Sequence, residues 1–139
     1  MIAGKKDAKS KKIEKVSSGR GIIHSKFSFN NTIFDLSKEN GEVLTVVSAG
    51  SVDLGNGKRV TGTKKSTEFM AIKVAEEIIK KAAEFGIHNI VEVQARGIGV
   101  GRDRAIKRVL EEKSLNVGAL SDTTPIPHGG CRPCKRPRK

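Results

Sequence analysis

The chain has 139 residues, and its 27 lysines and arginines against 15 aspartates and glutamates give a formal net charge of +12. This length corresponds to one domain, and a hydrophobic content of 36% suffices for a modest core. No apolar run approaches the roughly 20 residues that span a bilayer, and no signal-peptide core follows the lysine-rich start. We therefore expect neither a membrane protein nor a secreted one. The absence of tryptophan and tyrosine argues against a surface built on base-stacking aromatics.

The positive charge is concentrated at the two ends of the chain. Residues 1–20 hold seven basic and two acidic groups, and residues 128–139 hold five basic groups and no acid. The segment between them has 15 basic and 13 acidic groups, so it is almost neutral. A nearly neutral body with two cationic arms indicates a polyanionic partner such as a nucleic acid. The alternative is that the arms only keep the protein in solution.

Three strands are predicted at the start of the body. They cover residues 21–29, 32–36 and 43–47. The first alternates between two faces, and we expect Phe27 and Phe29 to lie together in the core rather than to stack on bases. Asn40-Gly41 is typical of a hairpin turn, so the second and third strands are expected to pair. Short connections between all three predict an antiparallel meander.

Residues 48–66 are rich in glycine and poor in large apolar side chains, which predicts a long loop. Four cations in this loop, set against the single acid Asp53, favour a binding role. They are Lys58, Arg59, Lys64 and Lys65. The glycine spacing at 57–62 approaches that of a P-loop, but the lysine required by that motif is displaced, and no strand leads into the loop directly. We therefore do not expect nucleotide hydrolysis.

A helix is predicted over residues 67–85, because apolar residues recur there at helical spacing. The expected stripe consists of Ile72, Ala75, Ile79 and Ala82 or Ala83. Ser66 is expected to cap the start of the helix, and Gly86 is expected to end it. Oppositely charged residues four apart are expected to pair on its solvated face. These pairs are Lys73/Glu77, Glu76/Lys80, Glu77/Lys81 and Lys80/Glu84.

The remainder of the chain predicts a strand, a second helix, a short strand and a tail. These elements cover residues 87–95, 103–113, 115–120 and 122–139. The apolar stripe of the second helix is expected to be Ala105, Ile106, Val109 and Leu110. The domain organisation is therefore a disordered basic arm at 1–18, one mixed-sheet domain at 19–121, and an extended tail. Right-handed crossovers predict that the later strands run parallel to a neighbour.

A glycine-rich turn stands between the fourth strand and the second helix. Gly97, Gly99 and Gly101 permit close approach of a ligand, and the start of the helix offers free N–H groups to a phosphate. The neighbouring arginines Arg96, Arg102 and Arg104 add charge. The dinucleotide-binding pattern fails, because Arg102 stands where its third glycine is needed. We expect a nucleic-acid phosphate here, and the alternative is a tight structural turn.

Neither a metal site nor a catalytic site is expected. Cys131 and Cys134 follow His128 at zinc-ligand spacing, and the C-x-x-C pattern also occurs in redox proteins, but no fourth ligand is placed and the segment is a proline-rich tail. Two cysteines without a secretory signal fit a reducing compartment. The strand at 21–29 contains no acid, whereas nucleases with a similar start need clustered acids for two metal ions. We predict that the protein is not an enzyme and has no cofactor.

Residues 19–139 contain five short motifs that follow one another along the chain. They are Phe29-Asn30-Asn31-Thr32, Ser48-Ala49-Gly50, Lys64-Lys65-Ser66-Thr67, Gly97-Ile98-Gly99-Val100-Gly101-Arg102 and the segment from Asp122 to Pro133. Together they resemble the family of the universal small-subunit ribosomal protein number eleven, in its bacterial or organellar form. The resemblance implies a ribonuclease H-like mixed α/β fold with a five-stranded sheet, in the order β-β-β-α-β-α-β, with basic extensions at both ends.

The resemblance also implies a function. Members are structural constituents of the small ribosomal subunit, and they bind its RNA at the platform, near the messenger exit path and the E site. Expected partners are this RNA and neighbouring platform proteins, with messenger RNA nearby, on a cytoplasmic or organellar ribosome, without a membrane or small-molecule substrate. The residues expected to face RNA are Ser48, Gly50, Lys58, Arg59, Lys64, Lys65, Ser66, Arg96, Gly97, Gly99, Gly101, Arg102, Arg104, His128, Arg132, Lys135, Arg136 and Arg138. Two alternatives are a free, chromatin-like nucleic-acid-binding protein and a nucleotide-binding enzyme.

The sequence departs from the family pattern at three places. The loop at 53–62 is longer than the family's short loop, Gly129-Gly130 stands where the family usually has Asn-Gly, and Cys134 stands at a position that is commonly proline. The contacts of the longer loop and any chemistry of the missing asparagine therefore do not transfer to this chain.

Overall fold

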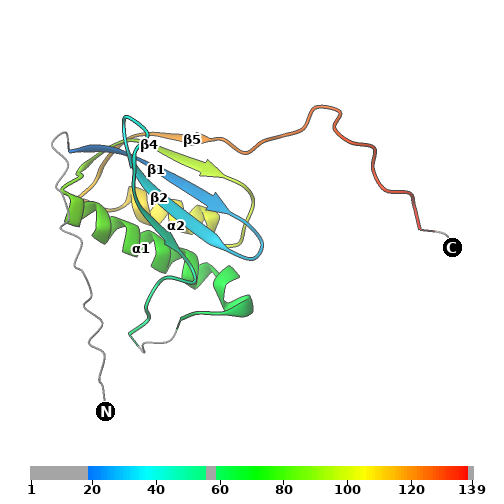
Figure 1. Cartoon of the computed structure of the whole chain (residues 1–139), viewed down its shortest axis with the longest axis horizontal. Helices are drawn as coiled ribbons and strands as arrows, with labels where there is room; N and C mark the ends of the chain where they lie inside the picture. The colour runs from blue at the N-terminus through cyan, green and yellow to red at the C-terminus, as the bar shows by residue number, and fades with distance from the viewer. Residues whose placement is uncertain (1–18, 56–58, 138–139) are drawn as a thin grey trace, which may run out of the picture.

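The computed structural model of the chain describes residues 19–55 and 59–137. It contains five strands, two α-helices and a short 3-10 helix (Figure 1). In chain order these are β1 (Arg20–Phe27), β2 (Thr32–Lys38), β3 (Val43–Ser48), η1 (Gly62–Ser66), α1 (Glu68–Phe85), β4 (Asn89–Arg96), α2 (Arg102–Leu110) and β5 (Asn116–Asp122). The arm predicted to be disordered, residues 1–18, lies outside the described residues, as do Lys58 and Arg138.

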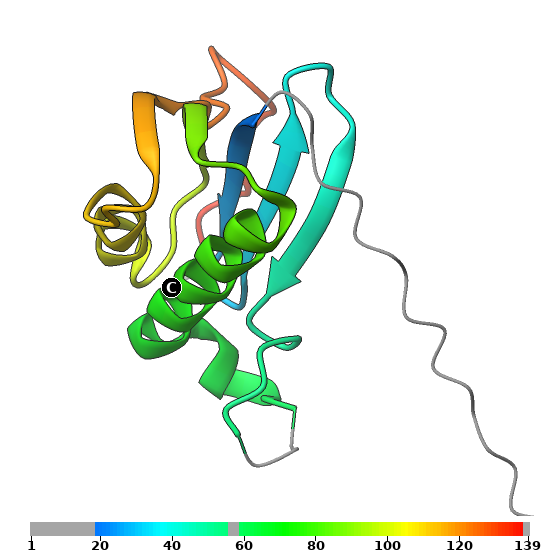
Figure 2. The same ribbon diagram turned by 90° about the vertical axis from the view of Figure 1, so that its left-hand side faces the viewer.

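The five strands form one mixed sheet in the order β3-β2-β1-β4-β5. The pairs β1–β2 and β2–β3 are antiparallel, whereas β1–β4 and β4–β5 are parallel. The predicted mixed α/β fold with a five-stranded sheet is therefore confirmed, including its antiparallel meander and its parallel later strands. Both helices lie on the same face of the sheet, as the two perpendicular views show (Figures 1 and 2).

The hairpin between β2 and β3 forms where the sequence predicts it. Gly41 has a φ of +85°, and the N–H of Lys38 donates to the carbonyl oxygen of Glu42 at 2.9 Å. Glycine adopts this left-handed conformation without steric strain, so a three-residue loop closes here.

The expectation that Phe27 and Phe29 share the core is wrong for Phe29. Strand β1 ends at Phe27, which is buried and packs edge-on against Phe34 with ring centroids 5.7 Å apart. The next residues form a turn, in which the N–H of Ser28 donates to the carbonyl oxygen of Asn31 at 3.0 Å. The alternation of a strand no longer applies in this turn, and Phe29 is 72% exposed.

The N-cap of helix α1 lies one residue later than predicted. Thr67, not Ser66, accepts the N–H of Met70 on its side chain. Ser66 belongs to the preceding 3-10 helix, where its hydroxyl donates to the carbonyl oxygen of Thr63 at 2.8 Å. At the other end Gly86 has a φ of +73° and terminates the helix, as predicted.

The face that α1 buries includes the predicted Ala75, Ile79 and Ala82 but is centred away from the predicted Ile72. Its buried residues are Met70, Ala71, Val74, Ala75, Ile78, Ile79 and Ala82, whereas Ile72 is only partly buried. The ion pairs on the outer face join residues three apart, Lys73–Glu76 and Glu77–Lys80, rather than the predicted residues four apart. Both spacings bring side chains together on a helix, so sequence spacing alone does not select between them.

Helix α2 packs against α1 and contributes Ala105, Ile106 and Val109 to the core. Leu110, predicted in the same stripe, is 44% exposed, because the helix ends at this residue. The sheet supplies the opposite side of the core with large buried side chains that include Ile23, Phe34, Leu36, Ile90 and Val93. Within the described part of the chain no helix is both long and apolar enough to cross a membrane.

Candidate nucleic-acid interface

Strand direction gathers most of the predicted contact segments at one end of the sheet. Strands β1, β3, β4 and β5 all run the same way, because only β2 is antiparallel to its neighbours. The segments that follow these strands begin at residues 28, 49, 97 and 123. They emerge at the carboxyl ends of parallel strands, although the first begins 95 residues before the last.

The basic loop after β3 brings three of its predicted residues together. A β-carbon on Gly50 would lie 3.2 Å from Cε and 3.3 Å from Nζ of Lys65, so the lysine side chain lies directly over this glycine. Ser48 forms a tight turn with Ser51, whose hydroxyl donates to the Ser48 carbonyl oxygen at 2.9 Å. The loop is tied to the core by the buried side chains of Val52 and Val60. The backbone around Val52 and Val60 is therefore anchored, while Arg59 and Lys64 remain exposed.

Arg59 and Lys64 line a hollow of about 490 Å³ beside the start of α1. The other lining residues include Leu54, Val60, Phe69 and Met70. Arg59 and Lys64 are both exposed, and neither forms an ion pair with an acid among the described residues. This hollow combines an apolar floor with two available cations.

The glycine turn meets its own chain at close range. With φ values of +89° and +82°, Gly97 and Gly101 adopt a conformation that other residues rarely take. A β-carbon on Gly97 would stand 2.2 Å from the carbonyl oxygen of Phe27, and one on Gly99 would stand 2.7 Å from that of Ser28. The close approach that Gly97 and Gly99 permit is therefore to the end of β1, and that of Gly101 is to α1, where an added β-carbon would stand 2.8 Å from Cα of Glu68. Packing within the chain thus accounts for the glycines without a ligand.

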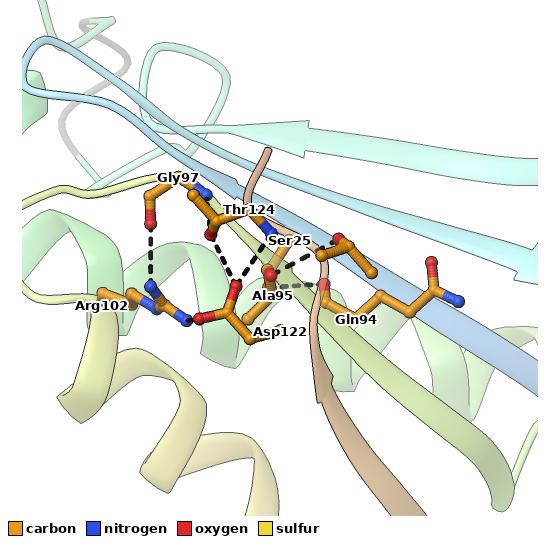
Figure 3. Close-up of polar contacts among 8 residues, drawn as sticks. Ser25, Gln94, Ala95, Gly97, Arg102, Asp122 and Thr124 are labelled. Carbon is orange, nitrogen blue, oxygen red and sulfur yellow. Dashed lines mark hydrogen bonds and ion pairs between the residues drawn. The ribbon is translucent and has the colours of Figure 1, made fainter. Parts of the chain in front are cut away.

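Arg102 is held by a network of hydrogen bonds at this turn (Figure 3). Its Nη1 donates to the carbonyl oxygen of Gly97 at 3.0 Å, and its Nη2 donates to Oδ2 of Asp122 at 2.6 Å. Thr124 completes the network, because its hydroxyl donates to Oδ1 of Asp122 at 2.6 Å and accepts the N–H of Gly97 at 2.9 Å. We call these four residues the clamp, since they fasten the segment after β5 to the glycine turn.

The charge of Asp122 is stabilised by its neighbours in the clamp. The hydroxyl of Thr124, followed by the guanidinium of Arg102 and the backbone N–H of Thr124, holds the pKa of this carboxyl well below its ordinary value of 3.8. Asp122 is therefore an anion under all but strongly acidic conditions. The predicted phosphate contact at Arg102 is already occupied by a carboxylate of the same chain.

The three arginines of the glycine turn do not converge on one site. Arg104 pairs with Glu68 of α1, and Arg102 belongs to the clamp. Arg96 is exposed and faces the other side of the sheet, because its neighbour Ala95 is buried against the helices and consecutive strand residues alternate. The hollow at the start of α2 contains Arg102 and Arg104 but also Glu68 and Asp103, so its cations are balanced by acids.

The tail leaves the body immediately after the clamp. The N–H of Thr123 donates to the carbonyl oxygen of Ala95 at 2.9 Å, and from Pro125 to Pro137 the chain has neither helix nor strand and extends away from the sheet (Figure 1). Its predicted contact residues His128, Arg132, Lys135 and Arg136 are all exposed, and so are the free thiols Cys131 and Cys134. Over the described part of the tail, no side chain beyond Thr124 forms an ion pair with the body.

Sequence analysis missed the structural role of Asp122 and Thr124. Their spacing is nevertheless informative, because the Asp122 carboxylate accepts the N–H two residues later at 2.9 Å, which is a common way for aspartate to form a local turn. It also missed Lys26, which lies on the face of β1 away from the helices. In residues 19–55 and 59–137, there is no group of three or more histidine, cysteine, aspartate or glutamate side chains that could hold a metal ion.

The fold and this arrangement define a small mixed α/β protein with an anchored basic loop and a clamped, extended basic tail. Comparison with known proteins identifies the particular family. The chain belongs to the ribosomal protein S11 family, whose model matches residues 21–138. It is 40% identical to the small ribosomal subunit protein uS11 of Thermotoga maritima, 39% to that of Nautilia profundicola and 38% to that of Kosmotoga olearia, and each comparison covers 99% of both chains.

Proposed function

We propose that the chain is a structural, non-catalytic component of the small ribosomal subunit, and that it binds small-subunit RNA at the platform. The observation that carries this proposal is the match to small-subunit relatives over 99% of both chains. The proposed partners are this RNA and neighbouring platform proteins, close to the messenger exit path and the E site. The proposed location is the ribosome.

The distribution of unpaired cations supports RNA binding. Arg132, Lys135 and Arg136 are exposed on an extended tail, and Arg59 and Lys64 are exposed on an anchored loop. A polyanion neutralises such cations and releases its counterions, which favours binding. A basic segment that folds back onto no part of its own body is typical of chains that become ordered on a nucleic acid.

The test is cosedimentation of the full chain with small ribosomal subunits at moderate salt. We expect it to travel with the small subunit, and recovery with free protein or with bulk DNA would contradict the proposal and favour a free nucleic-acid-binding protein. Saturable binding of a free nucleotide by the purified chain would instead favour the enzyme alternative. A density map of the assembled particle would then identify the RNA segments and the protein neighbours.

Deletion of residues 132–139 tests the role of the tail. It removes five cations, and each phosphate contact contributes about 0.7–0.9 to the slope of log affinity against log salt concentration. We therefore expect this slope to flatten by about 4 units, as measured by RNA binding at several salt concentrations. Cooperative unfolding should be unchanged, because the deleted residues contribute no buried side chain in the described structure. An unchanged slope would show that the tail does not contact phosphate.

A further inference from the structure

The face of the sheet away from the helices carries a polar network that the proposed contacts do not use. His24 is at its centre, with Nδ1 3.0 Å from Oε1 of Gln94 and Nε2 3.1 Å from the hydroxyl of Ser37. Gln94 donates in turn to Glu92 at 2.8 Å, and Glu92 also accepts the hydroxyl of Ser121 at 2.5 Å. The network crosses β2, β1, β4 and β5. Its members satisfy one another, so this part of the face is internally complete.

The end of the same face, by contrast, holds two cations side by side. Lys26 of β1 and Arg96 of β4 are register partners on adjacent parallel strands, and both are exposed. Like charges directly opposite each other in a sheet are destabilising. The described strands contain only two other cations, Arg20 and Lys38, and both pair with glutamates. Lys26 and Arg96 form no ion pair within the described chain.

A cleft of about 210 Å³ separates this cation pair from the polar network. It is lined by residues that include His24, Lys26, Asp35, Gln94, Arg96 and Thr123. Thr123 directly precedes the last residue of the clamp, so the cleft opens beside the point where the tail leaves the body. A strand of RNA that follows the tail would therefore pass the cleft.

Asp35 is the one acid among the described residues that line this cleft. Its Oδ1 is buried without a hydrogen-bond partner, and burial, partly offset by His24, raises its pKa above the ordinary 3.8. A buried acceptor without a donor is costly to a folded protein. This oxygen has almost no accessible surface, so the contacts of an RNA strand in the cleft fall to Lys26 and Arg96.

We infer that the helix-free end of the sheet is a second RNA-backbone site, in which Lys26 and Arg96 together bind phosphate. The inference rests on the proposed RNA-binding function and adds to it a surface opposite the helices. It also assigns a role to Lys26, and it separates Arg96 from Arg102 of the clamp. An anion between Lys26 and Arg96 converts their repulsion into a shared attraction.

The test compares two double variants of the full chain that lose the same charge. Lys26→Gln/Arg96→Gln removes the pair, and Lys80→Gln/Lys107→Gln removes two exposed lysines of the helices that lie near Glu77 and Glu111. Binding of small-subunit RNA is measured over a range of salt concentrations, together with the melting temperature of each free protein. We expect the first variant to reduce the salt slope by about 1.4–1.8, since two phosphate contacts are lost, and the control to change it little.

The melting temperature separates a binding role from a structural one. Removal of two like charges should leave the melting temperature of Lys26→Gln/Arg96→Gln unchanged or higher. A lower melting temperature with an unchanged salt slope would overturn the inference, and so would equal slopes for the two double variants. Failure of the wild-type chain to bind small-subunit RNA would instead contradict the proposed function itself.

Discussion

The glycine turn and the C-terminal tail have similar compositions but different surroundings. Both combine glycines with arginines, and the sequence predicts RNA contacts in both. In the turn, Arg102 and Arg104 are paired with Asp122 and Glu68, and the glycines lie against β1 and α1. In the tail, Arg132 and Arg136 are exposed and have no acid partner in the described structure. A cation beside a glycine is thus available to a ligand only where the fold supplies no acid for it.

The two regions are also connected. The clamp ties the start of the tail to the turn through Asp122 and Thr124. The turn therefore determines where the tail leaves the body, and the tail presents the cations. Changes in the turn should affect folding, whereas changes in the tail should affect only binding.

The largest expected difference between the two regions concerns their glycines. In Gly97→Ala, a methyl group would stand 2.2 Å from the carbonyl oxygen of Phe27 at a φ of +89°. We expect a loss on the order of 3 kcal/mol in the free energy of unfolding. Gly129→Ala is the matched control, because Gly129 also has a positive φ, of +78°, but no atom lies within 4 Å of its added β-carbon. Urea unfolding monitored by circular dichroism measures the free energy of unfolding of both variants. An equal loss in Gly97→Ala and Gly129→Ala would contradict the packing role of the turn.

A smaller difference is expected between two arginines. Arg102→Met removes the hydrogen bonds to Gly97 and Asp122, so we expect it to lower the free energy of unfolding. Arg132→Met in the tail should change the free energy of unfolding by less than about 0.5 kcal/mol. The two variants should show the opposite ranking in RNA binding. Only Arg132→Met is expected to flatten the slope of log affinity against log salt concentration, by about 0.7–0.9. A flatter slope for Arg102→Met would show that Arg102 leaves the clamp and contacts phosphate.

The smallest expected effect is the pH dependence of the clamp. The pKa of Asp122 is lower in the folded chain than its ordinary value of 3.8, so ionised Asp122 stabilises the fold at neutral pH. This contribution is complete above the ordinary pKa and is lost as the pH falls below about 4 toward the folded pKa. The melting temperatures of the wild type and Asp122→Asn should therefore differ most near neutral pH and converge in acid. A difference that stays constant from pH 2 to pH 7 would contradict the ionic role of Asp122.

Local sequence patterns predicted the fold well where an element depends only on residues close to it in the sequence. The three-stranded meander, the Asn40-Gly41 hairpin and the end of α1 at Gly86 all form as predicted. Two of the errors occur at boundaries. Strand β1 stops before Phe29, and Thr67 replaces Ser66 as the cap of α1. In both cases the competing turn is stabilised by hydrogen bonds that alternating or helical spacing does not reveal.

The candidate site was less predictable than the fold. The sequence by itself determined that the protein is basic and that its charge lies mainly in two arms. It also determined that the strands and helices follow one another in the order β-β-β-α-β-α-β. Only the tertiary structure decided which cations remain available. It placed Arg102 beside Asp122 and Arg104 beside Glu68, and it placed Arg96 beside Lys26 on the opposite face. The physical reason is that pairing depends on which strands are parallel neighbours and which face each residue takes, and these relations join residues far apart in the chain.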